Sequence, residues 1–256
     1  MIMITDLLAR HAAERGERPF IVTNDGSHSF SEVHSAALRF CQRLRAAGVT
    51  EGRHVGLIAA NSASYLVCWF GISMAGAVAV TLSDQLVADG LRYALDQSDV
   101  MLIVADSGWL ESPREPLTGK AADLPLIPIG ADREFFEEMK NGNEAKPARL
   151  PASSPCTILY TSGSTGLPKG VVNSHAAYEA AGKHTSLTVG LRESDRIMTF
   201  LPLFHANPQM FAVMSALHVG ASLAVLPKFS AGEFFRDAAR LGATCFTFVG
   251  TVLSIL

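Results

Sequence analysis

Residues 54–83 read HVGLIAANSASYLVCWFGISMAGAVAVTLS, without a single Asp, Glu, Lys or Arg. The pattern predicts an apolar strand at 55–60, a helix at 62–75 and a second strand at 77–82. Strands that are apolar on both faces and joined by a helix are typical of parallel sheets that helices cover on both sides. The chain is therefore expected to belong to the α/β class.

The alternation of helices and strands continues outward in both directions. Toward the N-terminus we expect a helix at 5–15 with Thr5 as its N-cap, a strand at 19–23, and a helix from Ser31 to the cap residue Gly48. Toward the C-terminus, helices are expected at 88–98, 208–219 and 231–242, and strands at 100–105, 197–201, 222–226 and 244–248.

This order predicts two α/β subdomains side by side, each a mostly parallel sheet covered by helices, the second one incomplete in this sequence. The first subdomain is expected at residues 1–155 and the second, which begins with a glycine-rich loop, at residues 156–256. The stretch at about 107–155 is rich in proline and contains a polar run at 140–146. We expect it to be a surface-exposed connection within the first unit.

The composition of the chain narrows the functional classes. Apolar residues make up 48% of its 256 residues and charged residues 18%, which is typical of a globular protein with a large core. The formal net charge of -3 and the lack of Lys/Arg clusters argue against a nucleic-acid surface. The four cysteines lie far apart in the sequence, which favours a reduced, cytoplasmic setting over a disulfide or zinc framework.

Two uncharged stretches, 54–83 and 197–227, are each long enough to span a bilayer. Polar residues interrupt both of them, among them Asn61 in the first and Asn207 in the second. A spanning helix would bury these groups at a cost of about a few kcal/mol each. Buried strand–helix–strand units explain the same pattern without that cost, so no membrane span is expected.

A loop rich in hydroxyl groups and glycine follows the connection, where residues 160–170 read YTSGSTGLPKG. Four of its side chains offer hydroxyl donors: Thr161, Ser162, Ser164 and Thr165. Gly163 and Gly166 allow successive backbone N–H groups to converge on an anion, and Lys169 adds one positive charge. Such a loop between two strands suits a polyphosphate, although a solvated surface turn can have the same composition.

The segment 160–170 does not match the motifs of other well-known loops of similar composition. A Walker A loop has Gly directly before its lysine and Ser or Thr after it, whereas Pro168 precedes Lys169 and Gly170 follows it. The sequence contains no GxGxxG, so a dinucleotide-binding fold has no support. A serine hydrolase has none either, because neither Ser162 nor Ser164 lies in a GxSxG motif.

The ordered string from Tyr160 to Gly170 closely resembles the signature of adenylate-forming enzymes, which include acyl-CoA synthetases, luciferases and the adenylation domains of peptide synthetases. MAGAVAV at 74–80 and LPLFH at 201–205 are similar to further motifs of this family. FHANPQ at 204–209 looks most like carnitine/crotonobetaine-type CoA ligases. The resemblance covers essentially the whole chain and corresponds to the N-terminal portion of those enzymes.

The resemblance implies a ligase reaction in two steps. A small carboxylic acid reacts with ATP to give an acyl-adenylate and pyrophosphate, and the thiol of coenzyme A then displaces AMP to form a thioester. ATP, Mg²⁺ and coenzyme A are the implied cofactors. Two alternatives stay open: an adenylation domain that loads a carrier protein, and a split, non-catalytic nucleotide-binding subunit. The sequence leaves open whether the protein is a homo-oligomer.

The resemblance also implies roles for particular residues. The phosphates of ATP would contact Thr161, Ser162, Gly163, Ser164, Thr165, Gly166 and Lys169. Lys169 and His205 are the candidate catalytic residues, and His205 would border the acyl pocket. A core histidine at a strand end is the alternative for His205. His175 matches a family position and would cap or support the loop, whereas the other histidines lack the spacing of metal ligands, so no metal site is predicted.

The final residues, GTVLSIL at 250–256, look like the N-cap and first turn of an apolar helix. Members of the family that this chain resembles continue well beyond this point. Their remaining part contains the segments that bind the adenine, the ribose and the metal, and it carries a catalytic lysine. We therefore expect the chain to be the N-terminal part of a CoA ligase and to be inactive by itself.

Overall fold

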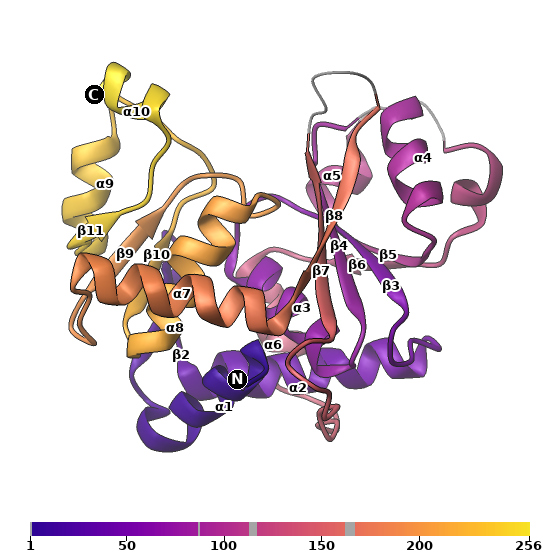
Figure 1. Cartoon of the computed structure of the whole chain (residues 1–256), viewed down its shortest axis with the longest axis horizontal. Helices are drawn as coiled ribbons and strands as arrows, with labels where there is room; N and C mark the ends of the chain where they lie inside the picture. Colours follow the sequence, from indigo (N-terminus) through magenta and orange to yellow (C-terminus); the bar gives the residue numbers. More distant parts are fainter. Residues whose placement is uncertain (1, 87, 113–116, 162–166) are drawn as a thin grey trace.

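The computed structural model describes residues 2–86, 88–112, 117–161 and 167–256. Within these residues the strands form one sheet of five and one of six, which lie side by side with helices packed around them (Figure 1). The prediction of an α/β fold with two mostly parallel, helix-covered sheets is thereby confirmed.

The six-stranded sheet has the spatial order β6-β5-β3-β4-β7-β8. Its strands are β3 (His54–Ile58), β4 (Val78–Leu82), β5 (Val100–Asp106), β6 (Leu126–Ile129), β7 (Pro155–Thr161) and β8 (Lys169–Ser174). Neighbouring strands are parallel except for β7 and β8, which are antiparallel. The carboxyl end of β7 therefore lies at the same edge of the sheet as the carboxyl ends of β3, β4 and β5.

The five-stranded sheet has the order β11-β9-β10-β1-β2. Its strands are β1 (Pro19–Thr23), β2 (Gly26–Ser29), β9 (Arg196–Thr199), β10 (Ser222–Val225) and β11 (Cys245–Phe246). β1 pairs in parallel with β10, where Ile21 lies opposite Leu223, and antiparallel with β2. The first strands of the chain thus complete a sheet built from its last strands. The division of the sequence at residue 155 stays a proposal, and both sheets contain strands from either side of it.

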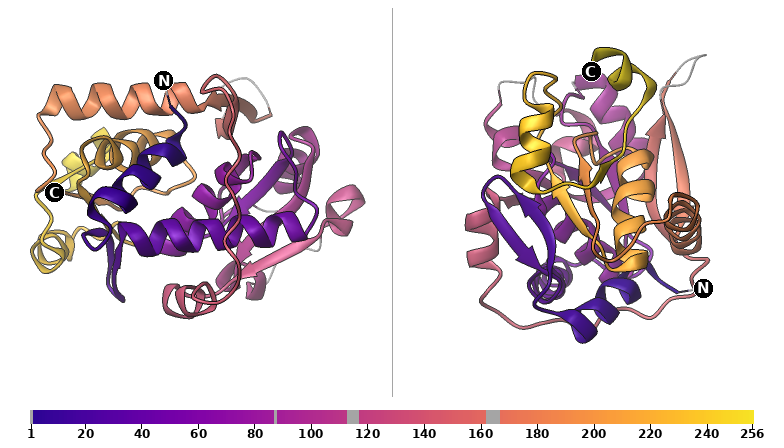
Figure 2. Two further views of the ribbon diagram at one scale, coloured as in Figure 1. Left: turned by 90° about the horizontal axis from the view of Figure 1, so that it is seen from below. Right: turned by 90° about the vertical axis from the view of Figure 1, so that its left-hand side faces the viewer.

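Helices cover the two sheets, with α1 and α2 along the lower side of the molecule in Figure 1 and facing the viewer in the left view of Figure 2. The α-helices are α1 (Ile4–Arg15), α2 (Phe30–Ala46), α3 (Ala63–Met74), α4 (Ala88–Gln97), α5 (Ser107–Glu111), α6 (Asp132–Glu138), α7 (His175–Val189), α8 (Met214–Val219), α9 (Phe234–Leu241) and α10 (Gly250–Ile255). A 3-10 helix, η1 (Gly119–Asp123), and a π-helix, η2 (Asn207–Val213), complete the set within the described residues.

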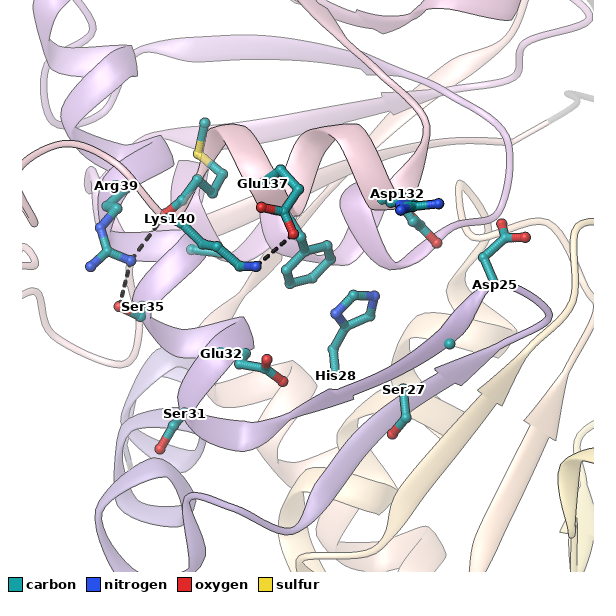
Figure 3. A pocket seen from close by; sticks show the side chains of 15 residues that line it. Asp25, Ser27, His28, Ser31, Glu32, Ser35, Arg39, Asp132, Glu137 and Lys140 are labelled. Atoms are coloured by element: carbon teal, nitrogen blue, oxygen red, sulfur yellow. Dashed lines mark hydrogen bonds and ion pairs between the residues drawn. The ribbon is translucent and has the colours of Figure 1, made fainter.

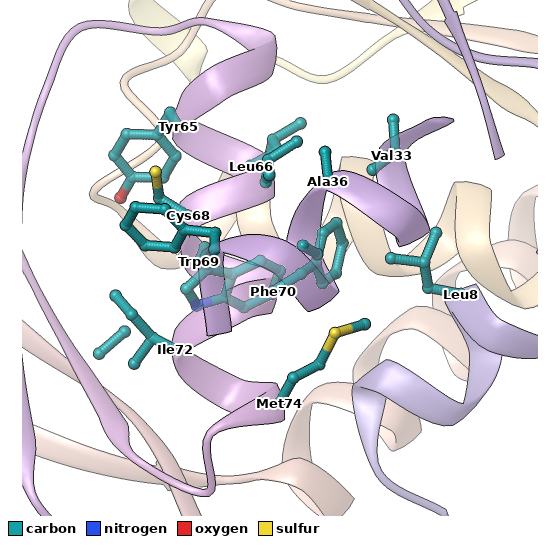
Figure 4. Packing of buried hydrophobic residues seen from close by; sticks show 14 of the residues in the cluster. Leu8, Val33, Ala36, Tyr65, Leu66, Cys68, Trp69, Phe70, Ile72 and Met74 are labelled. Atoms are coloured by element: carbon teal, nitrogen blue, oxygen red, sulfur yellow. The ribbon is translucent and has the colours of Figure 1, made fainter. Parts of the chain in front are cut away.

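Helix α3 links the two sheets, and all of its residues are buried (Figure 4). It begins where the Ser62 hydroxyl accepts a hydrogen bond from the backbone N–H of Tyr65 at 3.0 Å. On one side the Trp69 indole N–H donates to the hydroxyl of Thr157 in β7, also at 3.0 Å. A Cβ added at Gly71 would lie 2.8 Å from a ring carbon of Phe40, so the glycine permits the close approach of α2. A helix that is apolar on every face is stable here because neighbours surround it completely.

The predicted elements of the repeating units are confirmed to within a few residues, but two details at helices were wrong. The first helix begins at Ile4, after Met3, whose backbone N–H donates to the Asp6 carboxylate at 2.8 Å, so Thr5 is not its N-cap. The helix predicted at 208–219 starts as the π-helix η2 and becomes α-helical only at Met214.

The prediction of a surface connection at 107–155 was also wrong in part. This stretch contributes β6, which pairs in parallel with β5, and α6, whose Phe135 is fully buried. β6 is a four-residue edge strand in which exposed and buried residues alternate, and it includes Pro128. Proline is tolerated at a sheet edge, but in the sequence it hides the strand pattern.

Among the described residues, no helix combines the length and the apolar character that are needed to cross a membrane. The uncharged stretch at 54–83 folds as β3, α3 and β4. The stretch at 197–227 folds as most of β9 followed by η2, α8 and β10. Both stretches owe their composition to burial between sheets and helices.

Candidate functional site

The predicted phosphate loop connects β7 to β8. In the antiparallel register Tyr160 lies opposite Gly170 and Thr161 opposite Lys169. The Thr161 hydroxyl donates to the backbone carbonyl of Lys169 at 3.5 Å, and both residues are exposed. The predicted contacts Ser162, Gly163, Ser164, Thr165 and Gly166 lie outside the described residues. The two predicted contacts at the ends of the loop are thus held side by side by the strand pairing.

A cavity of about 630 Å³ lies beside this strand pair. Its described lining comes from the end of β7, from β8, from the segment between β9 and η2, from η2 itself and from the residue before α10. The lining residues are Leu159, Tyr160, Thr161, Val171, Asn173, Leu201, Pro202, His205, Ala206, Asn207, Pro208, Met210 and Val249. The structure therefore brings Thr161 and His205 together in one cavity, whereas Lys169 is not among the residues that line it.

His205 lies in the segment that joins β9 to η2. Its backbone N–H donates to the carbonyl of Pro202 at 3.0 Å, and its ring lies 4.3 Å from the ring of Phe204, centroid to centroid. Partial burial lowers the pKa of His205 below that of a free histidine, although the residue remains exposed on one side. The imidazole is therefore neutral at neutral pH, and its role at the acyl pocket stays a prediction.

A buried set of side chains, which we call the segment clamp, holds the backbone of residues 201–204. Asn61 makes three of its contacts: its amide donates to the carbonyls of Leu201 at 2.9 Å and Leu226 at 3.1 Å, and its side-chain oxygen accepts from Leu203 N–H at 2.7 Å. Three further side chains complete the clamp. The Tyr65 hydroxyl and the Gln209 amide both donate to the Leu203 carbonyl, and the Thr81 hydroxyl donates to the Phe204 carbonyl.

Sequence reasoning noticed Asn61 only as a polar break in an apolar stretch and gave it no role. The available signal was its position: a polar residue directly after a buried strand lies at the carboxyl edge of the sheet, where sites in α/β folds are found. Since Asn61 follows β3 and its partners follow β9 and β10, this one side chain connects the two sheets beside the cavity.

His175 supports the N-terminal helix and does not line the cavity. It is the first residue of α7 and is 1% exposed, and its Nδ1 atom accepts a hydrogen bond from the backbone N–H of Ile4 at 3.4 Å. Burial lowers the pKa of His175 to about 4. Nδ1 can accept this hydrogen bond only while it carries no proton, so geometry and pKa agree on a neutral ring.

The lowered pKa predicts a pH dependence of stability. Protonation is easier in the unfolded chain, at about pH 6.5, than in the folded one, so the folded state loses stability as the pH falls from 6.5 toward 4. We expect the free energy of unfolding to fall by about 2 kcal/mol more in the wild type than in His175→Asn between about pH 7 and pH 5. Urea unfolding of both proteins at the two pH values measures this difference. Equal losses in the two proteins would assign the acid sensitivity to other groups.

A second cavity, of about 440 Å³, lies between the β1–β2 hairpin, α2 and α6 (Figure 3). Charged residues line much of it: Asp25, Glu32, Arg39, Asp132, Arg133, Glu137 and Lys140. Some of them are already partnered, since Lys140 forms an ion pair with Glu137 at 2.5 Å. The ring of His28 stacks on Phe136 with the ring centroids 3.5 Å apart. In contrast, the described lining of the cavity beside β7 contains no Asp, Glu, Lys or Arg.

Together, the fold and the site define an α/β protein in which β7 and β8, the two strands that flank a glycine- and hydroxyl-rich segment, contribute to the lining of a largely apolar cavity. A family model described as "AMP-binding enzyme" matches residues 8–256, and the chain belongs to this family. Crotonobetaine/carnitine–CoA ligases from Salmonella paratyphi A and Shigella flexneri serotype 5b are each 29% identical to it, over 84% and 85% of the chain. The chain spans 44% of the length of each of these relatives.

Solved structures agree on the fold. The N-terminal domain of FACL13 from Mycobacterium tuberculosis, bound to an inhibitor, is similar with a TM-score of 0.86 and 25% identity, over 99% of this chain and 64% of that one. The long-chain-fatty-acid–CoA ligase FadD1 from Archaeoglobus fulgidus gives a TM-score of 0.89 at 23% identity, over 100% of this chain and 53% of that one. Both resemblances extend over almost the whole described chain, so its two sheets are an arrangement shared with these ligases.

Proposed function

We propose that this chain is the N-terminal, phosphate-binding part of an ATP-dependent carboxylate–CoA ligase. The observation that carries the proposal is that Thr161, at the end of β7, and His205, in the segment after β9, line one cavity, with Lys169 paired opposite Thr161. The activity is proposed for a longer polypeptide. It would contain this chain and also a part that corresponds to the region of the relatives that this chain does not cover. ATP, Mg²⁺ and coenzyme A are its proposed cofactors, and a small carboxylic acid is its substrate.

In the proposed first step, a carboxylate oxygen of the acid attacks the α-phosphorus of ATP. The bond from that phosphorus to the oxygen that bridges it to the β-phosphorus breaks, and pyrophosphate leaves with the negative charge. Thr161 and Lys169 stabilise this charge together with Ser162, Gly163, Ser164, Thr165 and Gly166 of the loop. Within the described residues no group of three or more His, Cys, Asp or Glu side chains could hold a metal ion, so we assign no step to Mg²⁺.

In the proposed second step, the thiol of coenzyme A attacks the acyl carbonyl and AMP leaves. His205 borders the acyl group and contributes a neutral, partly desolvated wall to its pocket. The named substrates of the relatives, crotonobetaine and carnitine, are carboxylic acids that carry a trimethylammonium group. They are therefore the first acids to test with a longer ligase that contains this chain.

A titration of the isotopically labelled chain tests the phosphate site without the rest of the enzyme. We expect ATP and pyrophosphate to shift the backbone amide signals of Thr161, Lys169 and Gly170 in NMR spectra, and adenosine to leave them unchanged. We also expect no acyl-adenylate from the chain alone, because it spans only 44% of the relatives' length and the proposed site would be completed by the remainder. If millimolar pyrophosphate shifts only amides remote from the loop, the phosphate assignment is wrong.

A further inference from the structure

The described lining of the cavity beside β7 contains no Asp, Glu, Lys or Arg. Its described lining contains eight apolar residues and five polar ones, namely Tyr160, Thr161, Asn173, His205 and Asn207. His205 is the imidazole in this set, and partial burial lowers its pKa below that of a free histidine, which favours the uncharged ring. The cavity therefore differs in kind from the charged one beside α6.

A trimethylammonium group in such a cavity would lose water without gaining a partner. Proteins bind quaternary ammonium groups with carboxylates or with cages of several aromatic rings. The described lining offers one phenol ring, that of Tyr160, and its hydroxyl donates to the carbonyl of Ala94 in α4 at 2.9 Å. This hydrogen bond anchors the ring toward α4, so the wall provides neither a carboxylate nor a cage.

We propose that the wall this chain contributes selects carboxylic acids with an uncharged, apolar acyl group over acids that carry a trimethylammonium group. The proposal rests on the proposed function, because it treats this cavity as the place where the acyl group binds. The apolar side chains that meet the acyl group are Leu201, Pro202, Pro208, Met210 and Val249, together with Val171 of β8.

A pair of acids that differ only in charge provides the test. Crotonobetaine and its carbon isostere, 5,5-dimethylhex-2-enoic acid, have the same shape, with a quaternary nitrogen in one and a quaternary carbon in the other. We expect the isostere to bind the chain at least about tenfold more tightly. Methyl signals of Val171, Met210 and Val249 in NMR titrations measure both affinities and place the ligand in the cavity.

Two neighbouring residues of β8 provide a matched pair of variants. Val171 lines the cavity, whereas Val172 is not among its lining residues, and successive side chains of a strand point to opposite faces. They are 45% and 59% exposed, so either position can accept a charged side chain without unfolding. We expect Val171→Glu to shift the affinity ratio toward crotonobetaine by about fivefold, because the new carboxylate pairs with the ammonium group, and Val172→Glu to leave the ratio unchanged.

Each outcome decides the proposal. Tighter binding of the isostere, with a shift of preference in Val171→Glu alone, supports it. Equal or tighter binding of crotonobetaine by the wild type overturns it, and so does the absence of saturable binding of the isostere at these methyl groups. The proposed function fails separately: if the acids bind in the expected order but ATP and pyrophosphate do not shift Thr161 or Lys169, the selectivity of the cavity stands and the ligase assignment falls.

Discussion

Replacing Lys169 with alanine is expected to slow acid-dependent exchange of pyrophosphate into ATP by about a hundredfold in a ligase that contains this chain. The residue lies at the start of β8, directly across the strand pair from Thr161, and it is exposed. Its ammonium group is the positive charge of the segment 160–170. Charge develops on the departing pyrophosphate in the transition state, so losing a positioned cation reduces kcat more than it weakens binding of the acid.

Two variants control this experiment. Lys183→Ala removes an exposed lysine of α7 and changes the net charge equally, and it is expected to leave the exchange rate unchanged. Lys169→Arg keeps the charge on a longer, planar group and should retain part of the rate. Exchange kinetics in Lys169→Ala that match those of Lys183→Ala would contradict the assignment of Lys169 to the phosphates.

Replacing Asn61 with alanine is expected to lower the free energy of unfolding by about 4 kcal/mol. The substitution leaves the Leu203 N–H and the carbonyls of Leu201 and Leu226 without their partner, and all three residues are buried. A buried polar group that loses its hydrogen bond costs about 1–3 kcal/mol because water cannot replace the partner. Urea unfolding, followed by circular dichroism, measures the effect.

We also expect the loss of the Asn61 hydrogen bonds to destabilise one segment of the chain before the rest. In Asn61→Ala, the amide protons of Leu201, Leu203 and Phe204 should exchange with solvent faster than those of β3 or β4, because the released segment opens locally. Asn141→Ala, in an exposed turn, serves as a control and should change stability by no more than about 0.5 kcal/mol. If Asn61→Ala unfolds at the urea concentration of the wild type, the three hydrogen bonds do not hold the segment.

The repeating units were predictable because their strands are buried on both faces. The stretch 54–83 is apolar without alternation, and that pattern has few explanations other than β3, α3 and β4. The edge strand β6 could not be predicted in this way, because half of its residues are exposed and it lacks a continuous apolar run. The pairing of β1 with β10 is not visible in the sequence either, because local patterns carry no information on which distant strand lies alongside.

The candidate site was predictable only where a sequence motif marks it. The spacing of glycine and hydroxyl residues at 160–170 predicts a phosphate-binding loop, and the motif LPLFH identifies the segment that contains His205. Asn61 and Thr81 belong to no such motif, because their partners are backbone carbonyls and N–H groups that any sequence would supply. The lack of charge in the cavity became visible only when residues from β7, β8 and η2 were brought to one place.

The pairing of β1 with β10 has a consequence for synthesis on the ribosome. The two strands meet at Ile21 and Leu223, which are about 200 residues apart, and a ribosome needs about 10–40 s to translate that length. During this interval the β1–β2 hairpin exists without the neighbour that covers its open edge. Since an unpaired strand edge invites association with other chains, we expect the open edge of β1 to be a site of aggregation in the nascent protein until β10 emerges.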